Sequence, residues 1–151
     1  MTQFRFRLHS LLELREALEK MQGRELGVAD GKAQDRRDES VASESQLLQV
    51  QAQAGHAEVG DTHPAGNFHA MALTVAAARQ RAIDDAAALA EAEARRAEEL
   101  ARYNEARTAR RALEKLRDRR EADWQVDEGR RERAETDEVA RRTIADRGKT
   151  P

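Results

Sequence analysis

Cysteine is absent from this chain of 151 residues, proline occurs only twice, and aromatic residues make up 3% of it. Without cysteine, neither a disulfide framework nor a thiolate metal site can form. With so few aromatic side chains, the chain has little bulky apolar material for a compact globular core. No stretch approaches the roughly 18 apolar residues that a membrane span needs. We therefore expect a soluble, cytoplasmic protein that is not a compact globule.

The chain is instead rich in charge, with 37% charged residues and a net charge of only -2. Alanine, glutamate, arginine and leucine dominate, which is typical of a coiled coil or a long helix. Disorder is the alternative explanation for low hydrophobicity. Disordered chains are usually enriched in proline, serine and glycine and carry a large net charge, so the composition favours helices.

The strongest interruption lies between Gly55 and Asn67, where three glycines and Pro64 fall within 13 residues. Such clusters break helices, and proline both lacks an amide hydrogen and disfavours a helical residue before it. The predicted segments follow in chain order: a first coiled-coil helix over 1–54, a hairpin loop over 55–67, a second coiled-coil helix over 68–146 and a tail over 147–151.

Apolar residues recur at spacings of three and four in both predicted helices, which places them on one stripe. We predict an all-α fold, a long antiparallel two-helix coiled-coil hairpin. The second helix is longer and would overhang from about Asp118 onward. Its alanine-rich seam buries little area and stabilises weakly. The predicted seam consists of Leu8, Leu11, Leu12, Leu18, Met21, Ile83, Ala90, Ala97, Leu100, Leu113 and Leu116.

Three glycines of the first helix, Gly23, Gly27 and Gly31, are spaced four apart. Each costs about 1 kcal/mol relative to alanine inside a helix. Two interpretations are open, a locally soft helix or a close approach of two helices along a small-residue stripe. We favour the soft helix, because the stripe is a rule of membrane helices.

Charge changes sign along the second helix. Residues 95–120 hold ten Arg or Lys and five Asp or Glu, whereas residues 121–139 hold three Arg and eight Asp or Glu. One interpretation is a solvated face with intrahelical ion pairs, such as Glu98 with Arg102 and Asp127 with Arg131. The other is a segmented electrostatic docking surface. The sequence supports both equally.

Residues for catalysis or metal binding are not arranged in a recognisable pattern. His56, His63 and His69 lie in or beside the loop with Asp61, but their spacing matches no zinc motif. Adjacent carboxylates such as Asp84–Asp85 diverge on a helix, and a two-helix rod offers no pocket. We expect no enzymatic activity, no metal and no cofactor.

Two binding alternatives remain. The first is a structural coiled-coil scaffold that associates only with itself. The second is nucleic-acid binding through the basic residues 95–120. Tyr103 is the single aromatic residue within that stretch, and no strong leucine heptad run follows it. We therefore expect no nucleic-acid partner.

Two stretches of the sequence, read together, resemble the FliJ family of flagellar type III export proteins. The first runs Phe4-Arg5-Phe6-Arg7-Leu8-His9-Ser10-Leu11-Leu12-Glu13-Leu14-Arg15-Glu16, which is similar to the family's N-terminal signature. The second is similar to its C-terminal pattern and consists of Ala112-Leu113-Glu114-Lys115-Leu116-Arg117-Asp118-Arg119-Arg120 followed by Trp124, Arg130-Arg131-Glu132 and Asp137-Glu138. Coiled-coil motifs are only moderately specific, and virulence-type secretion systems have related proteins.

The resemblance implies a central stalk or adaptor, and a general chaperone, of the flagellar export apparatus. Its expected partners are the hexameric export ATPase, the export gate membrane protein and export substrates or their chaperones. It would serve motility from the cytoplasmic side, associated peripherally with the inner membrane. The candidate ATPase-ring contacts that the resemblance implies are Phe4, Phe6, Arg117, Arg119 and Arg120. The candidate export-gate contacts are Phe68, Met71 and Val75.

Overall fold

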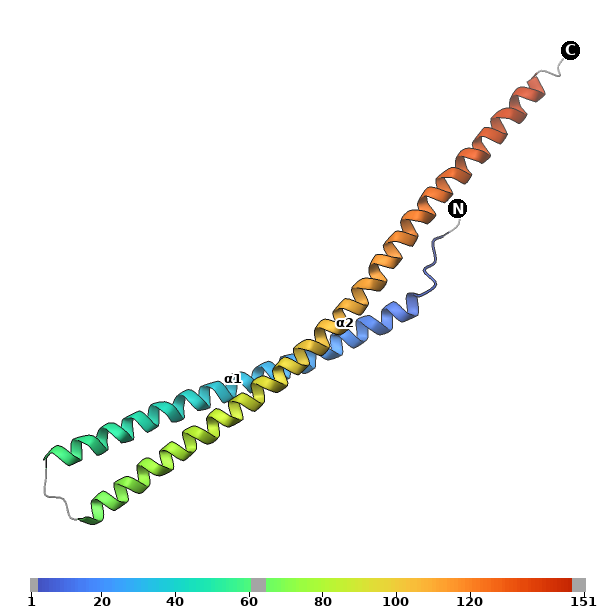
Figure 1. The fold of residues 1–151 in the computed structure, drawn as a ribbon. Coiled ribbons are helices and arrows are strands. Elements are labelled where there is room, and N and C mark those ends of the chain that lie inside the picture. Colours follow the sequence, from blue (N-terminus) through green and yellow to red (C-terminus); the bar gives the residue numbers. More distant parts are fainter. Residues whose placement is uncertain (1–2, 61–64, 148–151) are drawn as a thin grey trace. The chain divides into compact units, whose positions relative to one another are not determined.

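The computed structural model of this chain describes residues 3–60 and 65–147. These residues form two α-helices, α1 over His9–Gly60 and α2 over Ala65–Arg147 (Figure 1). Within these ranges there is no strand, so the predicted all-α fold of two long helices is confirmed. Neither described helix contains a stretch that is long and apolar enough to cross a membrane.

The helix bounds differ from the predicted segments. α1 begins at His9, because residues 3–6 are not helical and Arg7 and Leu8 form a turn in which His9 N donates to Phe6 O at 3.1 Å. α1 continues past the predicted end at Ala54, and α2 begins before Phe68. Each glycine there costs a helix only about 1 kcal/mol, and the alanine and glutamate neighbours offset this cost. The rest of the predicted loop, residues 61–64, and the tail residues 148–151 lie outside the described residues.

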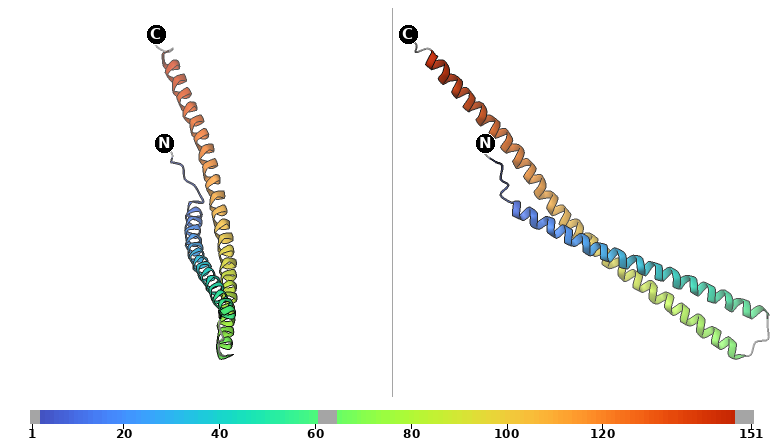
Figure 2. Two further views of the ribbon diagram at one scale, coloured as in Figure 1. Left: turned by 90° about the vertical axis from the view of Figure 1, so that its left-hand side faces the viewer. Right: turned by 180° about the vertical axis from the view of Figure 1, so that it is seen from behind.

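The chain divides into two compact units. We call Lys20–Glu105 the central unit, and Met1–Glu19 together with Ala106–Pro151 the terminal unit. In the central unit, Arg37 donates to Glu93 at 2.8 Å and Arg96 pairs with Asp30. Residue numbers rise along α1 while those of their partners fall along α2, so the helices run antiparallel, as Figures 1 and 2 show from three directions.

Small and polar residues line the contact between the helices of the central unit. Ala33 and Ala82 are 2% and 8% exposed, and the side chains of Ser40 and Ser43 are as buried as these alanines. Ser43 Oγ donates to the Ser40 carbonyl at 3.0 Å, which satisfies the buried hydroxyl within its own helix. Short side chains let the two backbones approach closely, but they bury little apolar area. This seam therefore stabilises the pair weakly.

The predicted seam of α2 was wrong over its first half. Ile83 is 55% exposed and Leu100 is 41% exposed, and Ala90 and Ala97 are exposed as well. The buried and half-buried positions lie one residue earlier in most cases, at Met71, Val75, Ala78, Ala82, Asp85, Leu89, Ala92, Glu99 and Tyr103. One residue corresponds to about 100° of rotation around a helix. The stripe predicted through Ile83 and Leu100 was therefore out of phase with the contact, and Ala90 and Ala97 were misplaced with it.

The three spaced glycines of α1 lie in different surroundings. A Cβ at Gly23 would meet Tyr103 Cε2 at 3.5 Å, whereas a Cβ at Gly27 or Gly31 would have no atom within 4 Å. Of the three glycines, Gly23 is therefore the one that lies close to Tyr103. Gly27 and Gly31 face open space, so a close approach of two helices along a small-residue stripe is not found at these two positions.

Replacing the two open glycines should stabilise the protein. Gly27→Ala and Gly31→Ala should each raise the free energy of unfolding by about 0.5–1 kcal/mol, because alanine loses less conformational entropy in a helix. Thermal unfolding followed by circular dichroism would measure the gain. A decrease in the midpoint for both variants would show that these positions contact something that a methyl group disturbs.

Enlarging a buried small residue should have the opposite effect. Ala82→Leu should destabilise the protein by about 1–3 kcal/mol, because the closely packed seam has no room for a larger side chain. Ala87→Leu, at an exposed position of the same helix, is the matched control and should change stability little. Equal stability of the two variants would contradict a closely packed seam at Ala82.

Candidate functional site

The terminal unit pairs the start of the chain with the middle of α2. Arg110 of α2 donates to Glu19 of α1, and the ring of Trp124 lies 6.0 Å from that of Phe4 at an interplanar angle of 47°. From Phe4 to Glu19 the residue numbers rise, while those of their partners in α2 fall from Trp124 to Arg110. This pairing is antiparallel, and residues 3–8 extend it although they are not helical.

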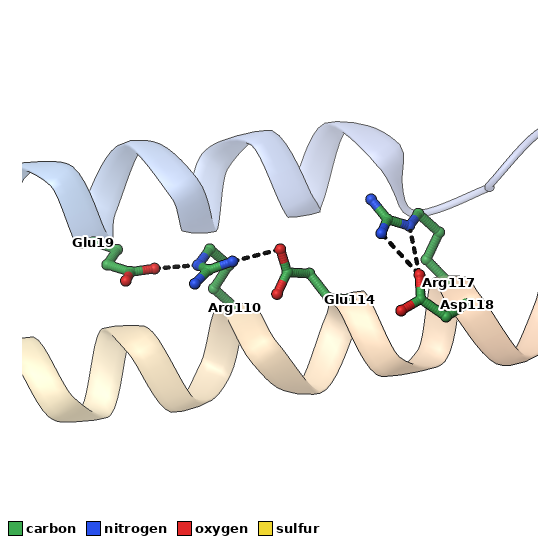
Figure 3. Close-up of polar contacts among 5 residues, drawn as sticks. All are labelled: Glu19, Arg110, Glu114, Arg117 and Asp118. Atoms are coloured by element: carbon green, nitrogen blue, oxygen red, sulfur yellow. Dashed lines mark hydrogen bonds and ion pairs between the residues drawn. The ribbon is translucent and has the colours of Figure 1, made fainter.

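A charged cluster fixes the register of this pairing. Arg110 Nε donates to Glu19 Oε2, and another nitrogen of the same guanidinium donates to Glu114 Oε1 one turn along α2 (Figure 3). The side chains of Arg110 and Glu19 are 22% and 14% exposed, so this is the most buried ion pair among the described residues. Arginine reaches two carboxylates at once because its donors form a planar fork.

The Glu19 hydrogen bond, followed by the charge of Glu114, raises the pKa of Arg110 above its ordinary value. A cation with a raised folded-state pKa stabilises the fold below its unfolded-state pKa, and this contribution is lost only as the pH rises through the folded-state value. Both values lie above the physiological range, so the arginine side of the cluster is constant with pH there.

Apolar packing in the terminal unit centres on one leucine. Leu12 is 2% exposed, while Leu18, Leu113 and Leu116 are half-buried. Leu8 and Leu11, which were predicted in the seam, are 39% and 38% exposed and lie at its margin. Met21, in the central unit, is 46% exposed and was also wrongly placed in the seam.

The two N-terminal phenylalanines are half-buried rather than free. Phe4 packs against Trp124, and Phe6 accepts a backbone hydrogen bond from His9 at the start of α1. A tilted aromatic pair of this kind contributes beyond its buried area. Both residues were predicted as contacts for an ATPase ring. In this structure Phe4 attaches residues 3–8 to α2, and Phe6 contacts the start of α1.

The three candidate arginines do not form a single patch. Arg117 donates two hydrogen bonds to Asp118 Oδ1, at 3.0 and 2.8 Å, and this partner raises its pKa (Figure 3). Arg119 and Arg120 are exposed and form no ion pair with any described residue. At about 100° per residue, Arg117 and Arg120 share a face of α2 and Arg119 projects to another side.

The net positive charge of residues 95–120 lies in the second part of that stretch. Residues 95–105 hold three basic and three acidic residues, whereas residues 106–120 hold seven basic and two acidic residues. We call residues 106–120 the basic segment. Residues 3–19, which pack against it, hold three Arg and three Glu and therefore leave its charge unneutralised. The boundary at residue 106 can be found from the sequence when charges are counted separately over the part of α2 that pairs with residues 3–19.

The rest of α2 has no partner helix in the terminal unit. We call residues 121–139 the acidic segment. The overhang starts after Trp124 and not near Asp118, because residues 3–8 lengthen the pairing. Residues 131–142 are exposed on all sides, and Val139 is 63% exposed. The ion pairs here differ from the predicted ones, with Asp127 to Arg130 and Glu128 to Arg131, each at 3.6 Å.

The candidate gate contacts lie in the central unit. Phe68 is 43% exposed, whereas Met71 and Val75 are half-buried on the seam. Of the three, Phe68 therefore offers the most surface to a partner. The described residues contain no group of three or more potential metal ligands, and His63 and Asp61 of the loop lie outside them.

A groove of about 730 Å³ runs between the helices of the central unit. Its lining combines short apolar side chains, including Ala29, Ala88 and Ala92, with charged side chains. One of the charged side chains is Glu99, whose Oε2 is buried and accepts no hydrogen bond from the described residues. Others pair with one another, Arg36 with Glu39 at 2.6 Å and Arg95 with Glu91 at 2.5 Å.

Two long antiparallel helices that pack through a seam with many polar residues define an all-α helical hairpin. The family model described as Flagellar FliJ protein matches residues 4–149, nearly the whole chain, so this protein belongs to the FliJ family. The family is a non-catalytic adaptor family with a role in flagellar export. Searches of curated proteins and of solved structures found no match.

The packing of Phe4 on Trp124 can be followed directly, because the chain has one tryptophan. Phe4→Ala should shift the fluorescence of Trp124 to longer wavelength, because the indole loses its apolar cover. Phe68→Ala, in the other unit, removes an exposed ring and is the control. An unchanged spectrum in Phe4→Ala would contradict the docking of residues 3–8.

Proposed function

We propose that this protein is a stalk or adaptor of the flagellar type III export apparatus that binds the export ATPase ring and links it to the export gate. Membership of the FliJ family supports the export role. The unneutralised basic segment of the terminal unit is the observation that supports a charged docking partner.

The basic segment suits a ring of several subunits. Arg119 and Arg120 are exposed and form no ion pair with any described residue. Arg120 shares a face of α2 with the half-exposed Arg117, and Arg119 projects to another side. A rod that presents positive charge in several directions can meet acidic loops of more than one subunit at once. Such long-range attraction mainly speeds association and aligns the partners.

The gate would bind at the other end of the helices, near the start of α2. Phe68 is the candidate anchor there, since aromatic side chains that bury a large area dominate protein interfaces. Contact with the gate membrane protein would hold the chain peripherally at the inner membrane, where it would contribute to motility. The exposed helix faces would also let it escort export substrates or their chaperones.

Weak packing between the helices fits an exchangeable adaptor. Beside a few larger residues such as Leu89 and Tyr103, the seam contains alanine, serine and charged residues. Gln22 Oε1 and Glu99 Oε2 are buried without hydrogen-bond partners among the described residues. Each such atom costs about 1–3 kcal/mol. A pair with this seam gains stability from a partner that covers more of its surface.

Reversing the three arginines tests the proposal. Arg117, Arg119 and Arg120 changed together to Glu should weaken binding to the purified export ATPase at least tenfold at low salt, because attraction becomes repulsion. Surface plasmon resonance would measure binding, and circular dichroism would show that helicity is retained.

The matched control changes Arg130, Arg131 and Arg133 to Glu, which alters the net charge by the same amount on the same helix. This control should bind the ATPase as the unaltered chain does. If the first triple variant also bound equally well, docking through the basic segment would be excluded.

A further inference from the structure

One side of α2 in the terminal unit faces away from the helix contact. At about 100° per residue, Lys115 and Trp124 project in opposite directions. On the side of Trp124, its ring packs against Phe4. Arg110, which pairs with Glu19 of α1, also projects toward that side. We call the residues of 111–133 that project within about 50° of Lys115 the outer face: Arg111, Lys115, Arg119, Ala122, Val126, Gly129 and Arg133.

The outer face carries positive charge only. Its four basic side chains are exposed and form no ion pair with any described residue. The acidic side chains of residues 121–133 all project to other sides of the helix. Asp118 lies at the edge of the outer face, where Arg117 binds it at 2.8 Å. Although the net charge of α2 changes sign after Arg120, this side stays positive for about 33 Å.

Apolar atoms lie among these charges. Ala122 and Val126 are exposed between Arg119 and Arg133, and Val126 is 55% exposed. The methylene groups of the lysine and arginine side chains add to the apolar area. A row of unpaired cations around short apolar side chains suits the surface of an anionic bilayer, because the cations meet headgroups and the apolar groups reach the acyl boundary.

Other acidic partners fit the outer face less well. The face has no aromatic side chain, so the bases of a nucleic acid find no stacking platform on it. A rigid acidic protein would need carboxylates at matching positions over about 33 Å. Lipids diffuse within a bilayer, so anionic headgroups can collect beneath each basic side chain without a preformed match.

We propose that the outer face binds a membrane surface that contains anionic phospholipids, with this part of α2 lying along the bilayer. The contact goes beyond the proposed adaptor function, because it requires neither the ATPase nor the gate protein. Arg117 and Arg120 project away from the outer face and stay available to an ATPase ring, whereas Arg119 serves both contacts.

Flotation of the full chain with vesicles is the first test. At about 0.05 M salt the chain should float with vesicles of phosphatidylcholine and phosphatidylglycerol in equal amounts, and it should stay in solution with pure phosphatidylcholine. At about 1 M salt, where charges are screened within about 3 Å, flotation should be lost. No flotation with the anionic vesicles at low salt would overturn the proposal, and equal flotation with both kinds of vesicle would overturn it as well.

Paired substitutions assign the binding to one side of α2. Lys115→Gln with Arg133→Gln removes two charges from the middle of the outer face, and Arg131→Gln with Arg142→Gln removes two exposed charges from the opposite side. Each basic residue near an anionic surface strengthens binding about fivefold, so the first variant should bind anionic vesicles about 25-fold more weakly. The second should bind nearly as the unaltered chain does. Equal binding by both variants would indicate attraction by net charge alone and exclude the outer face.

Engineered cysteines report contact with lipid, because the chain has none of its own. An environment-sensitive fluorophore on Ala122→Cys, within the outer face, should shift its emission to shorter wavelength when anionic vesicles are added. The same label on Ala134→Cys, exposed and about 100° away from Lys115, is the matched control and should shift little. An unshifted label at residue 122 would overturn the proposal.

Two further outcomes separate the membrane from other partners. Binding of a single-stranded RNA to the unaltered chain, without binding to anionic vesicles, would assign the outer face to nucleic acid and overturn the proposal. Binding to vesicles by a chain that does not bind the purified export ATPase would reject the ATPase docking and support the membrane contact.

Discussion

The interhelical ion pairs set the register on which the other features of this protein depend. Arg37 with Glu93 and Arg96 with Asp30 hold the central unit, and Arg110 with Glu19 holds the terminal unit. Alanine and serine at the seam contribute little directional preference, because small side chains fit together in several registers. The interhelical ion pairs form in one register, and they therefore remove this ambiguity. The cost is modest stability, since exposed ion pairs contribute only about 0–1 kcal/mol each.

A helix contact that depends on ion pairs, and not on a strong apolar seam, also connects the fold to its role in flagellar export. A helix pair with a strong apolar seam would hide its best binding residues, whereas this one leaves leucines, valines and charges on its outer faces. Charge is also segregated along α2, with the basic segment followed directly by the acidic segment. A basic stretch attracts acidic surfaces from a distance, and an acidic stretch attracts basic ones.

The sequence predicted the two helices, the break between them and the family, because composition and proline chemistry act locally. It placed Leu12, Leu18, Leu113 and Leu116 near the helix contact. It failed for Ile83 and Leu100, because the stripe predicted through them was out of phase with the contact at Ala82. It also failed for residues 3–8, because the contact of Phe4 with Trp124 joins parts of the chain that local patterns cannot relate. The spread of Arg117, Arg119 and Arg120 over different sides of α2 follows from helical spacing alone, but the pairing of Arg117 with Asp118 became clear only from the structure.

The same aromatic contact has a consequence for how the protein is made. Phe4 leaves the ribosome about 120 residues before Trp124, and synthesis proceeds at about 5–20 residues per second. The first residues therefore wait several seconds, without their partner, while α1 and most of α2 emerge. The contact can form only once Trp124 has been synthesised, so residues 3–8 attach to α2 after α1 and most of α2 have already been made.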